Sequence, residues 1–232
     1  MKKFLIVLLT VIMLVGCSNV DNKNDKNNDI ILDYDNKTLN GILEGIENDI
    51  EKNLSKYKAE YENIYTTIGN DYDKYIDNKE SLKNWYTSIE NDSLDLFKEL
   101  ERKSIEYFKL ITKEVGTKDK DIDDALDDYY DRVYDDALGK YYDELYDDLL
   151  GESYDQYYDG IISDAYDQVS YKEWSNESKM CYRQWSDSKS HIYRQWSDIK
   201  SDCYRMWSDV NSEFYNNNFD LDTYFEENYS AE

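Results

Sequence analysis

The chain of 232 residues contains no proline and only eight glycines. Proline is the residue that most strongly disrupts a helix interior, and it usually supplies about 5% of a sequence. Its absence leaves long helices without their commonest interruption, and no stretch of the chain alternates strand with helix. We therefore predict an all-α fold, in which a small helical bundle is followed by a long repetitive helical arm.

Residues that support catalysis are also scarce. His191 is the only histidine, and no general base or orienting partner accompanies it in the sequence. Glycine-rich phosphate loops, Cys-x-x-Cys and Gly-x-Ser-x-Gly motifs are missing. On one continuous helix Cys181 and Cys203 would lie roughly 33 Å apart, so we expect free thiols or a bridge between two chains. The sequence predicts a protein that is not an enzyme and has no catalytic, cofactor or metal site.

Basic residues number 27 against 52 acidic ones, which gives a formal charge of -25. After residue 3 there is no basic run, and nucleic acids are bound through lysine and arginine. This balance excludes a nucleic-acid partner. The many aspartates instead favour weak, multisite cation binding.

The first 17 residues carry the most specific motif. Lys2 and Lys3 precede an apolar run from 4 to 15, which ends in Leu14-Val15-Gly16-Cys17. This pattern is typical of a secretory signal, and the cysteine after a small residue resembles the lipobox of bacterial lipoproteins. About 12 apolar residues are too few for a membrane span of roughly 20. The resemblance implies a signal peptide over 1–16 and a lipid on Cys17.

Such a protein would be anchored by its lipid to the outer side of the cell membrane. The general composition, rich in Asn, Asp, Lys, Ile and Tyr, is similar to that of surface lipoproteins of low-GC Gram-positive bacteria. Residues 17–39 have few apolar side chains to order them, and we interpret them as a lipidated, disordered tether.

Residues 40–117 show three stretches of helical periodicity, at about 40–68, 71–89 and 93–115. The sequence predicts an N-cap at Asn40 and helix ends at Gly69 and Gly116. Three amphipathic helices of this length can bury one another, so we predict a helical bundle here.

Residues 118–170 are acidic and consist of twelve-residue repeats. Each repeat places a Tyr-Asp pair at the same position: Tyr130-Asp131, Tyr142-Asp143, Tyr154-Asp155 and Tyr166-Asp167. The underlying apolar period is four, which overshoots a turn of an α-helix by about 40°. The apolar band therefore either spirals around the helix or is reset at glycines. We favour kinks at Gly139, Gly151 and Gly160, since glycine costs roughly 1 kcal/mol within a helix.

Residues 171–215 repeat every eleven residues, a period that keeps one face of an almost straight helix. The columns of this repeat form a candidate interaction face: Tyr182, Trp185, Tyr193, Trp196, Tyr204 and Trp207. Three interpretations remain open. The face packs against another helix, or it binds a partner, because Trp and Tyr concentrate binding energy. Contact with lipid is disfavoured by the intervening Lys189 and Lys200.

Residues 216–232 form an acidic tail with little periodicity, and we expect it to fray. Together these features predict a membrane-anchored extracellular lipoprotein that acts as a non-catalytic surface interaction or scaffold protein through its aromatic helical face. Its partner would be another copy of the chain or an unknown protein. The alternative is a module that binds glycan or cell wall.

Overall fold

The computed structural model describes residues 37–114, 119–215 and 221–229. Throughout these ranges the regular elements are helical, and none of the described residues forms a strand. The predicted all-α class is confirmed. The predicted signal peptide, Cys17 and nearly all of the tether lie outside the described residues, as does Gly116.

Two long helices form the N-terminal half: α1 spans Leu39–Ile68 and α2 spans Tyr72–Glu114. The N-cap of α1 is Thr38, whose hydroxyl accepts a hydrogen bond from the amide of Gly41 at 3.0 Å, so the expected cap at Asn40 is two residues late. Gly69 ends α1 with a positive φ of 58°, a conformation that suits glycine.

α2 continues through residues 89–93, where the sequence pattern predicts a break between two helices. That prediction is wrong because the stretch contains no strong helix breaker. Ser93 is buried, and its hydroxyl donates to the carbonyl of Ile89 within the same helix at 2.6 Å.

The acidic repeats form a third segment, residues 119–167, in which α-helix and π-helix alternate. Its elements are α3 (Asp119–Tyr129), η1 (Tyr130–Ala137), α4 (Leu138–Tyr141), η2 (Tyr142–Leu149), α5 (Leu150–Tyr154), η3 (Asp155–Ile162) and the 3-10 turn η4 (Ala165–Asp167). The expected breaks at Gly139, Gly151 and Gly160 are wrong, because each of these glycines lies within a helical element and the extra residue of each repeat is taken up by π-helix.

The Tyr/Trp repeats form one continuous helix, α6, which spans Tyr171–Tyr215. A short helix, α7 (Leu221–Asn228), follows it. Phe225 of α7 is buried and stacks on Phe108 of α2 with ring centroids 6.2 Å apart, and the hydroxyl of Tyr224 bonds to Asp209 of α6. The expectation of a frayed tail is therefore wrong for the residues of α7.

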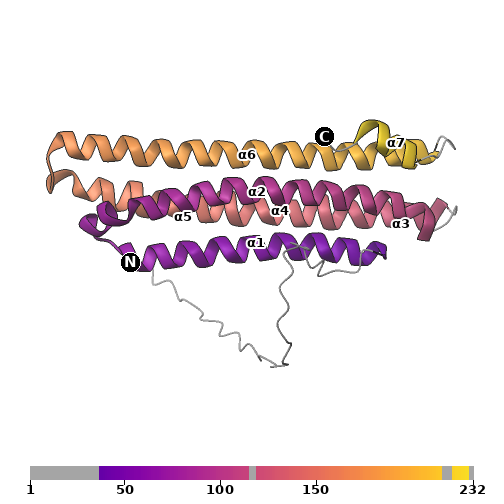
Figure 1. Ribbon diagram of the computed structural model, residues 1–232, viewed down its shortest axis with the longest axis horizontal. Helices are drawn as coiled ribbons and strands as arrows, with labels where there is room; N and C mark the ends of the chain where they lie inside the picture. The colour runs from indigo at the N-terminus through magenta and orange to yellow at the C-terminus, as the bar shows by residue number, and fades with distance from the viewer. Residues whose placement is uncertain (1–36, 115–118, 216–220, 230–232) are drawn as a thin grey trace, which may run out of the picture. The chain divides into compact units, whose positions relative to one another are not determined.

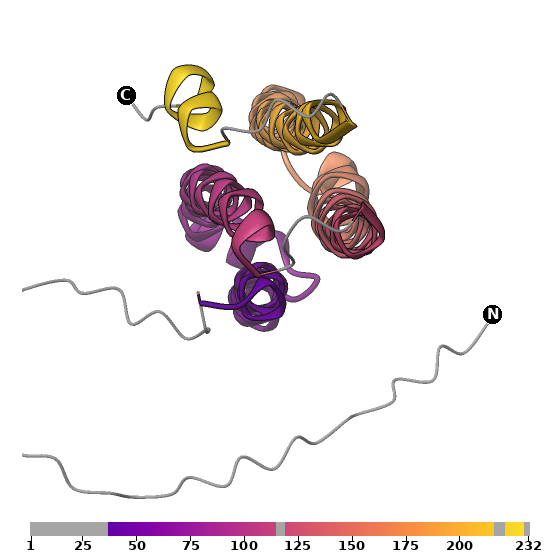
Figure 2. The ribbon, with the colours of Figure 1, turned by 90° about the vertical axis from the view of Figure 1, so that its right-hand side faces the viewer.

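α1, α2, the third segment and α6 lie side by side (Figure 1), and the end-on view of Figure 2 places them at four corners. α1 contacts α2 and the third segment, while α6 contacts α2 and the third segment. The neighbours α1 and α2 are antiparallel, as are the third segment and α6. The two repeat regions therefore pack against the first two helices within one unit, and they do not form a separate arm.

Ion pairs between elements show the register of the parallel neighbours. Glu47 and Arg132 join α1 to the third segment at 2.6 Å, and Lys79 and Glu177 join α2 to α6 at 2.8 Å.

Lys103 is buried and bonds to the carboxylate of Asp49 at 2.6 Å, which joins α2 to its antiparallel neighbour α1. A buried ammonium requires such a partner, because an isolated buried charge is very costly.

Buried tyrosines join α2 to the third segment across the centre of the bundle. Four hydrogen bonds do so: Tyr86 with Ser153 at 2.9 Å, Tyr129 to Ser104 at 2.7 Å, Tyr107 to the carbonyl of Ala125 at 2.7 Å, and Ser93 with Tyr141. A buried phenol needs a partner for its hydroxyl, and these bonds supply it. Nine tyrosines thus belong to the buried core, beside a larger number of aliphatic side chains.

Candidate functional site: an aromatic seam

The aromatic residues of the two repeat regions meet along one line, which we call the aromatic seam. It contains the rings of Tyr130, Tyr134, Tyr142, Tyr146, Tyr154 and Tyr158 in the third segment and of Trp174, Tyr182, Trp185, Tyr193, Trp196, Tyr204 and Trp207 in α6. The seam includes all six residues of the predicted interaction face. Of the interpretations left open by the sequence, packing against another helix describes its tryptophans.

Each of the four tryptophans in α6 donates its indole N–H to a backbone carbonyl of the third segment. The pairs are Trp174 with Ile162 at 2.9 Å, Trp185 with Leu150 at 2.8 Å, Trp196 with Leu138 at 2.8 Å, and Trp207 with Leu126 at 3.2 Å. The donors are eleven residues apart and the acceptors are twelve residues apart. Two different repeat lengths therefore cover the same distance along the bundle.

The two lengths agree because each repeat makes about three helical turns. Eleven residues at 3.6 per turn make three turns to within about 20° and rise roughly 16.5 Å. Twelve residues of α-helix would overshoot three turns by about 120°. The third segment avoids this overshoot through its π-helical stretches.

The backbone hydrogen bonds show where the widening occurs. The amides of Leu138, Leu150 and Ser163 each donate to a carbonyl five residues earlier, at Val133, Leu145 and Tyr158. Such i→i+5 bonding defines the π-helix, which places more residues in each turn than the α-helix. The twelve-residue repeat thereby returns to the same face of the bundle.

Each complete repeat of the seam has the same ring arrangement. The third segment contributes two tyrosines four residues apart, and α6 contributes a tyrosine and a tryptophan. The centroid distances between the first tyrosine and the tryptophan are 4.9 Å for Tyr130 and Trp207, 4.5 Å for Tyr142 and Trp196, and 4.4 Å for Tyr154 and Trp185. Tilted rings at this separation add stabilisation beyond the area that they bury.

Two lysines cover part of the seam. Nζ of Lys189 lies 4.3 Å from the ring centroid of Tyr146 and 5.4 Å from that of Trp185. Lys200 lies in the same way over Tyr134 at 4.5 Å and Trp196 at 5.3 Å. An ammonium within about 6 Å of an aromatic face is attracted by the electrons of the ring.

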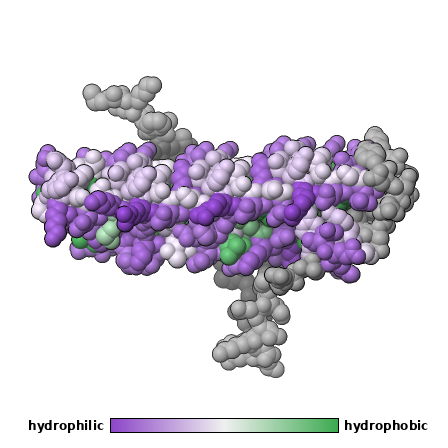
Figure 3. Space-filling view, turned by 90° about the horizontal axis from the view of Figure 1, so that it is seen from above, coloured by the Kyte–Doolittle hydropathy of each residue, from purple (hydrophilic) through white to green (hydrophobic). Residues whose placement is uncertain are grey.

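The outer edge of the seam is open to solvent. Tyr182, Tyr193 and Tyr204 are 44%, 43% and 46% exposed, whereas the four seam tryptophans are half-buried. Seen from the side of α6, the molecule is mostly purple and pale, with only small green patches (Figure 3). The surface seen from this side is therefore polar and has no broad apolar patch.

The first tyrosine of each complete repeat of the seam has a raised pKa. Partial burial, followed by the negative charge of the neighbouring aspartates Asp135, Asp147 and Asp159, raises the pKa of Tyr130, Tyr142 and Tyr154. These three tyrosines therefore act as neutral rings.

The cysteines of α6 face the core and not the seam. Both are free and buried, which agrees with the expectation of free thiols and makes a bridge between two chains inaccessible in the folded state. Burial raises the pKa of the Cys181 thiol to about 11 and that of Cys203 to about 12, although hydrogen bonds with Tyr75 and Tyr129 act in the opposite direction. Because a thiolate is the reactive form, these thiols are unreactive. His191 is exposed on another face.

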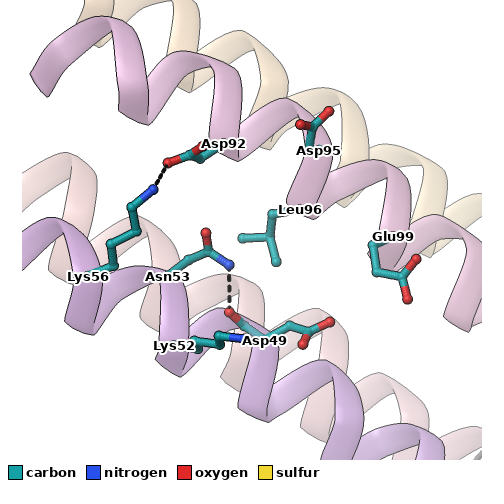
Figure 4. A pocket seen from close by; sticks show the side chains of 8 residues that line it. All are labelled: Asp49, Lys52, Asn53, Lys56, Asp92, Asp95, Leu96 and Glu99. Atoms are coloured by element: carbon teal, nitrogen blue, oxygen red, sulfur yellow. Dashed lines mark hydrogen bonds and ion pairs between the residues drawn. The ribbon is translucent and has the colours of Figure 1, made fainter. Parts of the chain in front are cut away.

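A second candidate site is the polar groove between α1 and α2 (Figure 4), which is lined by Asp49, Lys52, Asn53, Lys56, Asp92, Asp95, Leu96 and Glu99. Three of its four carboxylates already have cationic neighbours. Lys56 pairs with Asp92 at 2.5 Å, Lys103 pairs with Asp49, and Arg102 lowers the pKa of Glu99 through a hydrogen bond. Within the described ranges, no three His, Cys, Asp or Glu side chains are grouped closely enough to hold a metal ion.

No family model, no curated protein and no solved structure matches this chain. None of the helices in residues 37–114, 119–215 and 221–229 combines the length and the apolar content that a membrane span requires.

Proposed function

We propose that the chain is a lipid-anchored protein of the outer cell surface, which acts without catalysis by binding a partner through the exposed edge of its aromatic seam. The export and the anchor rest on the sequence of residues 1–17. The binding role rests on one observation: Tyr182, Tyr193 and Tyr204 stay half-exposed at regular intervals, although the tryptophans beside them are committed to packing.

The spacing of these tyrosines suits an elongated partner. Successive rings lie roughly 16.5 Å apart along α6, because each step is eleven residues. Tyrosine contributes a large contact area with few rotatable bonds and therefore binds at a low entropy cost. A partner protein that runs along α6 would meet three similar contacts.

The anchor is tested by replacing Cys17 with serine in the full chain and labelling growing cells with radioactive palmitate. The unchanged chain is expected to take up label and to remain with the membrane fraction. Cys17→Ser should abolish both. Label that persists in this variant would remove the anchor from the proposal.

The binding face is tested with a photo-crosslinking phenylalanine analogue at position 193 on intact cells. We expect one discrete adduct with a surface protein, which disappears when Tyr182 and Tyr204 are changed to serine. The matched control carries the same analogue at position 65, since Tyr65 is 40% exposed on α1 and lies away from the seam. Identical adducts from both positions would contradict a specific face.

A glycan of the cell wall is the second candidate partner, because rows of aromatic rings also stack on sugars. Co-sedimentation with purified wall polymer distinguishes a glycan partner from a protein partner. Retention that falls at least about tenfold in the Tyr182→Ser, Tyr193→Ser, Tyr204→Ser variant, but not in Tyr65→Ser, would assign the face to glycan. The exposed aspartates of the third segment would add weak, multisite cation binding.

A further inference from the structure

One position of the eleven-residue repeat holds a lysine in two repeats of the seam and a neutral serine in the repeat before them. Lys189 and Lys200 occupy the same place in successive eleven-residue repeats, and the repeat before them has Ser178 there. Each lysine places its ammonium between a tryptophan four residues earlier in α6 and a tyrosine of the third segment. The corresponding rings for position 178 are Trp174 and Tyr158, and no cation of the described residues lies over either.

The framework around Ser178 matches the two repeats that hold lysine. The indole of Trp174 bonds to the carbonyl of Ile162 at 2.9 Å, compared with 2.8 Å for the bonds of Trp185 and Trp196. The centroid distance between Tyr158 and Tyr182 is 5.5 Å, and the two equivalent pairs lie at 5.6 Å and 5.7 Å. These two distances agree with those of the repeats where an ammonium binds. The ring of Tyr166, however, meets Trp174 at an interplanar angle of 88°, compared with 46° and 42° for the equivalent pairs.

The charges nearby also favour a cation. Asp159 follows Tyr158 and is exposed, and the third segment has 18 acidic residues against three basic ones. Lys172 and Lys179 are exposed in other columns of the repeat, which place arginine or serine at the equivalent positions. Lys172 and Lys179 therefore do not supply a cation to the rings of the seam.

We propose that Trp174 and Tyr158 bind an external alkylammonium ion, whose charged group takes the place that Lys189 and Lys200 fill in the other repeats. Tyr182 borders this site, and Asp159 adds a long-range attraction. The site goes beyond the proposed surface role and depends neither on the lipid nor on the partner of the tyrosines.

The probe is n-butylammonium chloride, which reproduces the end of a lysine side chain, and its neutral control is butan-1-ol. Each is titrated into the purified full chain while the indole N–H signal of Trp174 is followed by NMR. We expect millimolar binding of the cation that shifts Trp174, and an affinity at least about fivefold above that of the alcohol, because the alcohol lacks the cation–π attraction. Equal affinities would overturn the proposal.

Two substitutions test the site in opposite directions. Ser178→Lys should supply an internal ammonium, abolish the shift of Trp174 and raise the melting temperature. Lys189→Ser should open a second site between Trp185 and Tyr146 and raise the stoichiometry from one to two. The control Ser190→Lys adds the same charge at an exposed position of another column and should leave binding unchanged.

The same titration distinguishes two sources of the cation. Tighter binding of a blocked Ala-Lys-Ala peptide than of n-butylammonium indicates a lysine of a partner protein, and the reverse order indicates a free amine. The proposal is overturned if Ser178→Lys still binds the probe, or if Lys189→Ser stays folded and gains no second site.

Discussion

The third segment and α6 cover the same distance along the bundle with different numbers of residues. α6 uses eleven residues of regular α-helix for each repeat, whereas the third segment uses twelve and forms three π-helical stretches. The indole bonds hold the two in step at four points. The comparison shows that a helix absorbs one extra residue per repeat when a neighbouring helix defines where each repeat must end.

The two segments also divide the charge between them. Residues 119–167 contain 18 acids and three bases, while residues 171–211 contain six acids and seven bases. Lys189 and Lys200 of α6 lie over tyrosines of the acidic segment, so the seam combines ring packing with attraction between unlike surfaces.

The largest effect should come from deleting one exposed residue of α6, Asp187, between Trp185 and Trp196. Ten residues complete about 2.8 turns, so the two indoles would no longer face the same side. We expect the free energy of unfolding to fall by more than about 4 kcal/mol, because half of α6 must leave its packing. Urea unfolding followed by circular dichroism measures this, and Asp187→Ala is the control. A small loss would show that register in α6 does not matter.

Truncating one seam tryptophan should cost less. Trp196→Ala removes a large half-buried ring and should destabilise the protein by about 3 kcal/mol. Trp196→Phe keeps most of the ring but loses the donor to Leu138, and about 1 kcal/mol is expected. If both variants cost the same, the hydrogen bond carries the effect and ring packing does not.

Because the thiols of Cys181 and Cys203 on the buried side of α6 have raised pKa values, we expect the protein to lose stability in alkaline solution. A thiol with a raised pKa in the folded state stabilises the protein fully below the pKa of the unfolded chain, about 8.5, and this contribution is lost as the pH rises towards the folded value. The raised pKa of Cys203 alone should lower the free energy of unfolding by on the order of 1 kcal/mol at pH 9.5 relative to neutral pH. Cys203→Ala should reduce this slope between pH 8 and 10, and an unchanged slope would assign it to other groups.

The smallest of these effects concerns a lysine of the seam. Lys200→Met keeps the aliphatic chain and removes the ammonium over Tyr134 and Trp196, at an expected cost of about 0.5–1 kcal/mol. Lys172→Met, at an exposed position away from the rings, should cost less than that. Equal melting temperatures for the two variants would show that the cation–π contacts do not stabilise the seam.

The fold class was predictable from the lack of proline, and the eleven-residue period delimits a helix that the structure places at the same residues, Tyr171–Tyr215. The π-helical stretches were not predicted, because a period of four is equally consistent with a spiral band or with kinks. The acceptors of the indoles are backbone carbonyls, which leave no mark in a sequence. The contacts of Lys189 and Lys200 with tyrosines of the third segment could not be predicted, because they depend on the antiparallel packing of the two repeat regions.

The central claim is that each repeat of both segments completes three helical turns. It is tested most directly by deleting Asp148, an exposed residue of η2, from the full chain. The shortened repeat has eleven residues, which complete three turns as regular α-helix. We expect that the indole N–H signals of Trp185 and Trp196 keep their positions, that η2 becomes α-helical, and that the free energy of unfolding falls by less than about 1 kcal/mol. A loss as large as that caused by deleting Asp187 would contradict it.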